Sequence, residues 1–281
     1  MVREFYLENE LGQRYSLMDM ENGCLFTNPE GLGFSRTLEY EQVADDFVEN
    51  VNKLNQALIQ GEVNFLNYNN YRSFVNFVLS ANKLRLIYLV PSGQTTEEFF
   101  KDIKISELTK TEIKPNGVMT ENITMDSLGL WNKKTDIIYN ISAQSDEVRW
   151  NFRFPSKFVS YSNRQIIYSN TGHKQASFLL ELPGFVINPS LIIKQNDEII
   201  NTITIETTID EDETLYYCTK PSDTFIYKVD SNGVRTNLFS LFDINNTNFF
   251  QLPKGTCEID LVADNEIENA KLTIYQEYIG I

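Results

Sequence analysis

The sequence has few of the residues on which most catalytic and metal centres depend. It contains one histidine, His173, and three cysteines, Cys24, Cys218 and Cys257, which lie far apart and show no CxxC spacing. A metal site with several histidine ligands is therefore excluded, and a Ser-His-Asp triad or a Cys-His dyad would have to be built on His173 alone. The glycine before His173 is typical of a surface loop, and we expect the cysteines to be free, buried thiols.

Long apolar runs and positive charge are also scarce. No stretch approaches the roughly 18 apolar residues of a membrane span, and the N-terminus lacks the apolar core of a signal peptide, so we expect a protein made and kept in a cytoplasm. Lys and Arg number 24 against 39 Asp and Glu, which gives a formal net charge of −15. Because the basic residues are scattered, nucleic-acid binding and docking on anionic lipid are disfavoured. No glycine precedes a Lys-Ser or Lys-Thr at the spacing of a phosphate-binding loop.

Carboxylates are abundant without forming a recognisable site. Asp210–Glu213 offers the oxygen ligands that calcium prefers, yet it lies between two strand-like segments and is typical of a solvated turn. Asp230–Gly233 begins like a calcium loop but has no closing glutamate, which indicates a hairpin turn. Trp131 and Trp150 could stack on sugar rings, although tryptophans near strand ends are more often core residues. We therefore predict no catalytic, cofactor-binding or metal-ligating residue and no enzyme activity.

What the sequence does contain favours β structure in two domains. Aromatic, Asn, Thr, Ile and Val residues are frequent, and 281 residues can supply two separate cores. Tyr71 to Ala81 is the one stretch with clear helical period, since Tyr71, Phe74, Val75 and Val78 share one face. A helix of about three turns must lie on another element to be stable, and the strand-like Leu84–Val90 follows it.

Strand patterns extend on both sides of this helix. In the first half they predict a hairpin of Arg3–Leu7 with Gln13–Leu17, a loop over Thr27–Phe34, a strand over Ser35–Val43, and a hairpin of Ile103–Ile113 with Met119–Met125 around Pro115-Asn116-Gly117. Phe47–Leu58 fits a helix as well as a strand. The second half consists of short strands with Gly, Pro and Asn between them, which predicts an antiparallel sandwich. The polar stretch Ser142–Glu147 is the expected domain boundary.

Several short motifs, in order along the chain, resemble the distal tail proteins of siphophages that infect Gram-positive bacteria. They begin with Arg3–Asn9 with Gly12, Leu17–Asp19 and Leu25–Gly33. They continue through Gly61–Phe65, Tyr71–Phe77, Lys110–Ile113, Leu130-Trp131, Gly184–Pro189 and Leu252–Gly255. Each motif alone is unspecific, but together they span nearly the whole chain.

The resemblance implies a mainly β protein with two domains. Residues 1–142 would be the ring-forming (belt) domain, a β-sandwich or split barrel with one packed helix, and residues 143–281 a galectin-like β-sandwich. Six copies would form a ring at the distal end of the phage tail, binding the tail tube protein on one side and tail-tip proteins, such as a tail-associated lysin or receptor-binding proteins, on the other. The localisation implied is the virion tail tip, with the host cytoplasm during assembly. An acidic channel would suit the passage of DNA, because like charge prevents the polymer from binding.

Open strand edges can pair with a neighbouring subunit, so we expect ring contacts at the N-terminal hairpin, Ser35–Glu41 and Ile103–Ile113. A charge placed at Ile105 would then break the ring. An alternative function is a carbohydrate-binding, lectin-like tail protein that contacts the host cell wall. The galactoside patterns His-x-Asn-Pro-Arg and Trp-Gly-x-Glu are absent, because Asn188-Pro189 is followed by Ser190 and neither tryptophan by glycine. A third, weaker alternative is a tail-associated wall hydrolase.

Overall fold

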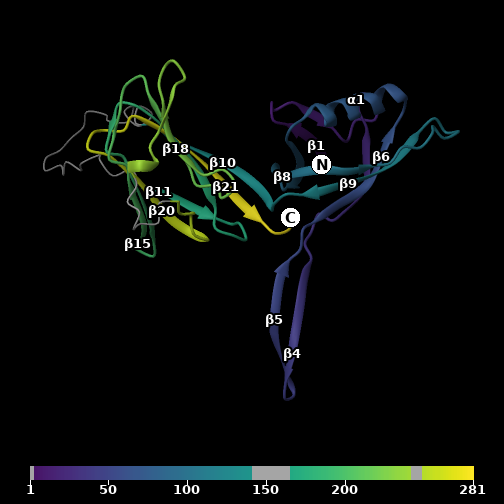
Figure 1. The fold of residues 1–281 in the computed structure, drawn as a ribbon, viewed down its shortest axis with the longest axis horizontal. Helices are drawn as coiled ribbons and strands as arrows, with labels where there is room; N and C mark the ends of the chain where they lie inside the picture. Colours follow the sequence, from purple (N-terminus) through teal and green to yellow (C-terminus); the bar gives the residue numbers. More distant parts are fainter. Residues whose placement is uncertain (1–2, 141–164, 242–248) are drawn as a thin grey trace. The chain divides into compact units, whose positions relative to one another are not determined.

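The computed structural model describes residues 3–140, 165–241 and 249–281. It divides into two compact units, here called the first unit, Met1–Lys133 with Tyr278–Ile281, and the second unit, Lys134–Glu277. The fold is mainly β with antiparallel strand pairs, as the sequence predicts (Figure 1). The stretch Ser142–Glu147, where we expected a boundary, lies outside the described residues. Among the described residues, no helix is long and apolar enough to cross a membrane.

The first unit is a sheet that closes on itself. Its strands are hydrogen-bonded in the order β3-β6-β9-β8-β7-β1-β2. The gap between β3 and β1 is bridged by Leu17, whose amide donates to the Phe5 carbonyl at 2.9 Å and whose carbonyl accepts from the Phe26 amide at 2.8 Å. The strands are β1 (Glu4–Asn9), β2 (Arg14–Ser16), β3 (Leu25–Glu30), β6 (Leu58–Phe65), β7 (Leu84–Ser92), β8 (Thr95–Leu108), β9 (Met119–Ser127) and the start of β10 (Trp131–Asn140).

The long strand β8 makes this closure possible. Its first part, Thr95–Ile103, pairs with β7, and its last part, Ile103–Leu108, pairs with β9, with a register shift between Ile105 and Glu107. One strand thus belongs to both halves of the barrel. The predicted strand Ile103–Ile113 captures only its end, because the turn at Gly93 leads directly into β8. The turn at Gly117 is present, with the Gly117 amide donating to the Lys114 carbonyl at 2.8 Å.

The α-helix α1 (Tyr68–Ser80), the one α-helix of the described residues, confirms the helical pattern and starts three residues earlier than predicted. Its N-cap is Asn67, whose side-chain oxygen accepts the Asn70 amide at 2.9 Å. Phe74 is fully buried and packs against Phe65 and Tyr15, with ring centroids 5.6 and 5.5 Å away. The helix therefore covers the barrel core with the side chains that the period of 3.6 places on one face.

Between β3 and β6 the chain forms the arm, a two-stranded hairpin of β4 (Arg36–Val43) and β5 (Asp46–Leu54). Figure 1 shows it projecting away from the rest of its unit. In the ambiguous stretch Phe47–Leu58, the part Phe47–Leu54 is strand, because its pairing with β4 decides what periodicity could not. The predicted loop Thr27–Phe34 is partly wrong as well: Thr27–Glu30 belongs to β3, where a bulge with Asn28 at φ 51° interrupts the alternation.

The second unit is an antiparallel sandwich, as predicted. One sheet has the order β19-β18-β17-β12-β21-β10, the other β11-β20-β14-β15, and β13 pairs with β16. The bounds are β11 (Gln165–Asn170), β12 (Ser177–Pro183), β13 (Val186–Ile187), β14 (Ser190–Gln195), β15 (Glu198–Thr204), β16 (Thr208–Ile209), β17 (Thr214–Cys218), β18 (Phe225–Val229), β19 (Arg235–Asn237), the 3₁₀ helix η2 (Phe239–Leu241), β20 (Gly255–Val262) and β21 (Asn269–Tyr278).

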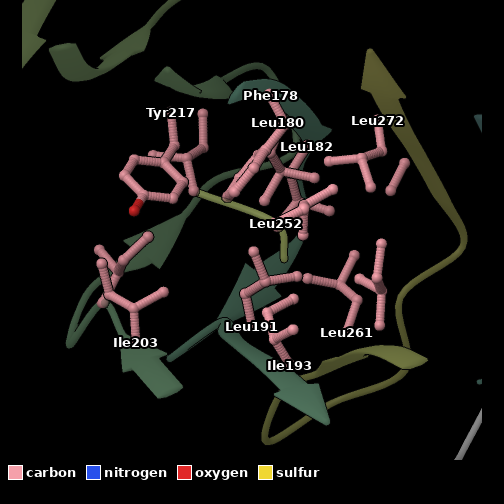
Figure 2. Close-up of a cluster of buried hydrophobic side chains, with 14 of the residues drawn as sticks. Phe178, Leu180, Leu182, Leu191, Ile193, Ile203, Tyr217, Leu252, Leu261 and Leu272 are labelled. Atoms are coloured by element: carbon pink, nitrogen blue, oxygen red, sulfur yellow. The ribbon is translucent and has the colours of Figure 1, made fainter. Parts of the chain in front are cut away.

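The core of the second unit lies between its two sheets. Figure 2 shows Phe178 and Leu180 from β12 and Leu272 from β21 pointing toward Leu191 of β14 and Leu261 of β20. These side chains are at most 6% exposed. Each comes from an alternating strand, so the apolar face predicted by the period of two is the face that is buried.

The three cysteines are free and buried, as predicted. Burial raises the pKa of all three thiols, that of Cys257 to about 11. A thiol with such a pKa is protonated at neutral pH and is a poor nucleophile.

Candidate functional site

The structure places His173 and the acidic turns on the surface. His173 is exposed, and its backbone amide donates to the Glu277 carbonyl at 2.7 Å. Asp210–Glu213 is a turn between β16 and β17, closed by the Glu213 amide on the Asp210 carbonyl, and Lys228 lies 2.7 Å from the Glu213 carboxylate. Within the described ranges, no group of three or more His, Cys, Asp or Glu side chains is placed to hold a metal ion.

The second acidic turn is a hairpin, as predicted. Asp230 accepts the amides of Asn232 and Val234 at 2.9 and 2.8 Å, and these bonds lower the pKa of its carboxyl. The hydrogen bonds to its carboxylate stabilise the turn between β18 and β19.

Trp131 is a core residue rather than a platform for sugar rings. It is fully buried in the first unit, and its indole Nε1 donates to the Leu32 carbonyl at 3.0 Å. The other tryptophan, Trp150, lies outside the described residues.

The arm is the most unusual surface of the described chain. Every residue of β4 and most of β5 are exposed, although the two strands carry large apolar side chains on both faces. Phe47 is 70% exposed and Tyr40 is 55% exposed. A two-stranded hairpin without a third strand or a packed face is marginally stable in water, so this exposure indicates a surface that another element covers.

The electrostatics of the arm are strongly one-sided. Between Arg36 and Leu54 it carries five carboxylates and two cations, and the apolar residues alternate with the carboxylates along the pairing. Glu41 lies opposite Val48, and Val43 lies opposite Asp46. A partner of the arm would therefore have to offer both apolar contact and positive charge.

Parts of two of the three segments that we expected to have open strand edges are paired on both sides. Strand β1 lies between β2 and β7, and β8 lies between β7 and β9. The side chain of Ile105 packs against the barrel core, so a charge there would perturb the fold as well as any contact. Strand β4 pairs with β5 alone, so the segment Ser35–Glu41 has an open edge. Strand β2 of the N-terminal hairpin stands at the end of its sheet order and pairs with β1 alone among the described strands.

At the root of the arm lies a pocket of about 400 Å³, here called the root pocket. Its walls include Phe34 just before the arm, Leu54 at the end of the arm, Leu128 and Leu130 from the loop after β9, and Ile279. The side-chain amide of Gln56 donates to the Ser127 carbonyl at 2.9 Å and joins the chain after the arm to the end of β9. The pocket is therefore mainly apolar and supported by fixed backbone.

One charged group, Lys101, lies in the wall of the root pocket. It is 2% exposed, and its Nζ is 4.9 Å from the centroid of the Trp131 ring. Burial lowers the pKa of the Lys101 ammonium to about 8. No carboxylate among the described residues forms a salt bridge with it, whereas the neighbouring cations Arg85 and Lys133 have such partners. The pocket thus presents a buried cation that lacks a counter-charge.

Comparisons with known proteins identify the first unit. Residues 4–128 match the family model described as the distal tail protein, N-terminal domain. That stretch contains the barrel, the helix and the arm, so the first unit matches the N-terminal domain of distal tail proteins, which confirms the resemblance seen in the sequence.

Solved structures extend the likeness to the whole chain. The phage P2 baseplate in its activated conformation with calcium contains a chain that is 18% identical, with all of both chains covered and a TM-score of 0.67. The same baseplate with strontium gives 18% identity, full coverage of both chains and a TM-score of 0.66. The SPP1 Dit protein, described as a paradigm of the hub adsorption apparatus in phages infecting Gram-positive bacteria, is 9% identical over 98% of this chain and 99% of its own, with a TM-score of 0.61. At these identities, the TM-scores show a shared fold. No curated protein sequence matches the chain.

Sequence reasoning missed the two features that define this surface. The arm alternates like any strand, so nothing in the pattern distinguishes a free hairpin from a buried one. Lys101 interrupts the alternation of Phe99 and Ile103, two core residues on the same face of β8. A charge at a core position is the signal that could have identified it.

Proposed function

We propose that this protein is the hub at the distal end of a phage tail, where six copies form a ring. The ring would join the tail tube protein on one side to tail-tip or baseplate proteins, such as a tail-associated lysin or receptor-binding proteins, on the other. It would leave a central channel for DNA, and the net charge of −15 per chain keeps such a channel from binding the polymer. Its site is the virion tail tip, reached by assembly in the host cytoplasm.

The observation that carries this proposal is the exposed arm. Its apolar side chains need a cover, and a hairpin with open edges and apolar faces can obtain it from the next subunit. When the same contact repeats between identical chains as arm to body, it is heterologous and generates a ring if the rotation closes. The domain match and the likeness to baseplate chains support the tail as the place of that ring.

We assign a separate role to each of the two units. The first unit, which carries the arm, would be the ring-forming domain, and the second would be a galectin-like sandwich. A sandwich of this kind does not by itself bind sugar.

The solution mass of the purified chain, measured by light scattering on a size-exclusion column, tests the ring. Six chains of 32.5 kDa give about 195 kDa, and negative-stain images of the same peak should show particles with a central hole. The double variant Tyr40→Ser/Phe47→Ser should be a folded monomer. As a matched control, Tyr227→Ser on the second unit should leave the mass unchanged. A wild-type chain that stays monomeric at every concentration would contradict assembly by the arm alone.

A further inference from the structure

We propose that the root pocket binds the tip of the arm of a second copy of this chain, with an aspartate of the tip meeting the Lys101 ammonium. The tip is Val43–Phe47, the turn of the hairpin and its flanking residues. This inference rests on the proposed ring and names the surface on which the arm of each subunit would end.

The pocket is built for a group that is both apolar and negatively charged. A buried ammonium without a counter-charge is unfavourable, and the contact with the Trp131 ring offsets only part of that cost. The remaining wall is largely apolar, with Phe34, Leu54, Leu128 and Leu130 in it. A free inorganic anion would satisfy the ammonium but leave these side chains uncovered, whereas a peptide with a carboxylate among apolar residues would satisfy both.

The arm tip has this chemistry. Asp45 and Asp46 stand between Val43-Ala44 and Phe47, so two carboxylates are flanked by apolar side chains. Val43 and Phe47 are 55% and 70% exposed, and no salt bridge of the described residues involves either aspartate. A pocket of about 400 Å³ can hold an aspartate side chain together with part of the phenylalanine ring.

The occupant must come from another copy. Strand β5 has nine residues, and at about 3.3 Å per residue the tip lies roughly 30 Å from the root of its own arm. Figure 1 shows the arm extended, so its own tip does not fold back on the pocket. A tip on one chain and a pocket on the next are different patches, which is the arrangement that a ring of identical subunits requires.

Disulfide trapping in the full-length chain tests the contact directly. One variant carries Ala44→Cys at the tip, and a second carries Leu128→Cys on the exposed rim of the pocket. Mixed in equal amounts under mild oxidation, they should give a disulfide-linked heterodimer. The native cysteines are buried and should not interfere. The matched control pairs Ala44→Cys with Lys104→Cys, an exposed position on the same strand as Lys101, and should give at least tenfold less of the heterodimer.

The charge contact is tested in the same assay. Lys101→Met, added to the Leu128→Cys chain, should lower the heterodimer yield at least fivefold at limiting protein concentration, as should Asp45→Asn/Asp46→Asn in the Ala44→Cys chain. Lys104→Met should have no effect. Circular dichroism and the melting temperature show whether each variant is folded.

The outcomes separate this inference from the ring itself. A particle of about 195 kDa without the Ala44–Leu128 crosslink, or with a crosslink that is indifferent to Lys101→Met, would overturn the pocket contact and leave the ring standing. A chain that remains monomeric and does not crosslink would overturn both.

Discussion

At the scale of single residues, Lys101 is where the chain departs most from ordinary folding rules. It stands on the core face of β8 between Phe99 and Ile103, and its charge is removed from water without a carboxylate partner among the described residues. A buried ammonium without a counter-charge lowers the free energy of unfolding of the free subunit. Polar residues that oppose folding in this way are expected at functional sites.

We expect Lys101→Met to stabilise the monomer. In the monomeric Tyr40→Ser/Phe47→Ser background, the free energy of unfolding at pH 7 should rise by about 1 to 2 kcal/mol, because the desolvated charge is replaced by an apolar side chain. The folded-state pKa of about 8 lies below the unfolded value of 10.5. The destabilisation of the folded subunit by the Lys101 ammonium is therefore complete below pH 8. It is lost as the pH rises from about 8 to 10.5, because Lys101 releases its proton at lower pH in the folded state than in the unfolded state.

Urea unfolding at pH 7 and pH 10 measures this difference. The difference in the free energy of unfolding between the Lys101→Met variant and its Lys101 parent should be smaller at pH 10 than at pH 7. Lys104→Met should show no such change with pH. A destabilised methionine variant at pH 7 would mean that the ammonium has a partner in the free subunit.

Residue types alone predicted the thiols and acidic turns well. The cysteines are buried, and Asp210–Glu213 and Asp230–Gly233 are turns, because these outcomes depend on local chemistry. The place of Lys101 in a pocket could not be predicted, because the loop after β9 and the two ends of the arm come together only through pairing of distant strands.

At the scale of elements, the helix and most strands follow from periodicity, whereas their lengths and partners do not. The stripe of Tyr71, Phe74 and Val78 predicted α1, because apolar residues with a period of 3.6 identify a helix without knowledge of its partners. Phe47–Leu58 was ambiguous because the helix and strand templates both fit, and pairing of Phe47–Leu54 with β4 decided for strand. The bulge at Asn28 hid the end of β3 within what looked like a loop.

The junction between β3 and the arm depends on Gly31. It has φ 77°, and a Cβ there would lie 1.8 Å from the Leu58 carbonyl oxygen. We expect Gly31→Ala to destabilise the first unit by about 2 kcal/mol or more, because both the backbone conformation and the space require glycine. The matched control is Gly117→Ala, with φ 80° and nothing within 4 Å, which should cost only about 1 kcal/mol. Chemical denaturation measures the free energy of unfolding of both variants. An equal loss in the two would contradict the predicted steric clash with the Leu58 carbonyl.

At the scale of the whole molecule, each unit has its own hydrophobic core. Leu86 in the first and Leu182 in the second are both fully buried. We expect Leu86→Ala and Leu182→Ala each to cost about 2 to 5 kcal/mol, with the loss confined to one unit. Hydrogen exchange should show faster exchange in β7 and β8 for the first variant and in β12 and β17 for the second. Faster exchange across both units in either variant would indicate a single cooperative structure.

The first unit consists of two separate stretches of chain, Met1–Lys133 and Tyr278–Ile281, and the second unit lies between them in the sequence. The second unit is thus an insert, and the crossings fall within β10 and β21, which are neighbours in one sheet. An insert whose two ends lie on neighbouring strands can be exchanged for another module with closely spaced ends while the host barrel keeps its pairing. Recombination at these two crossings would change the second unit and leave the strand pairing of the first unit intact.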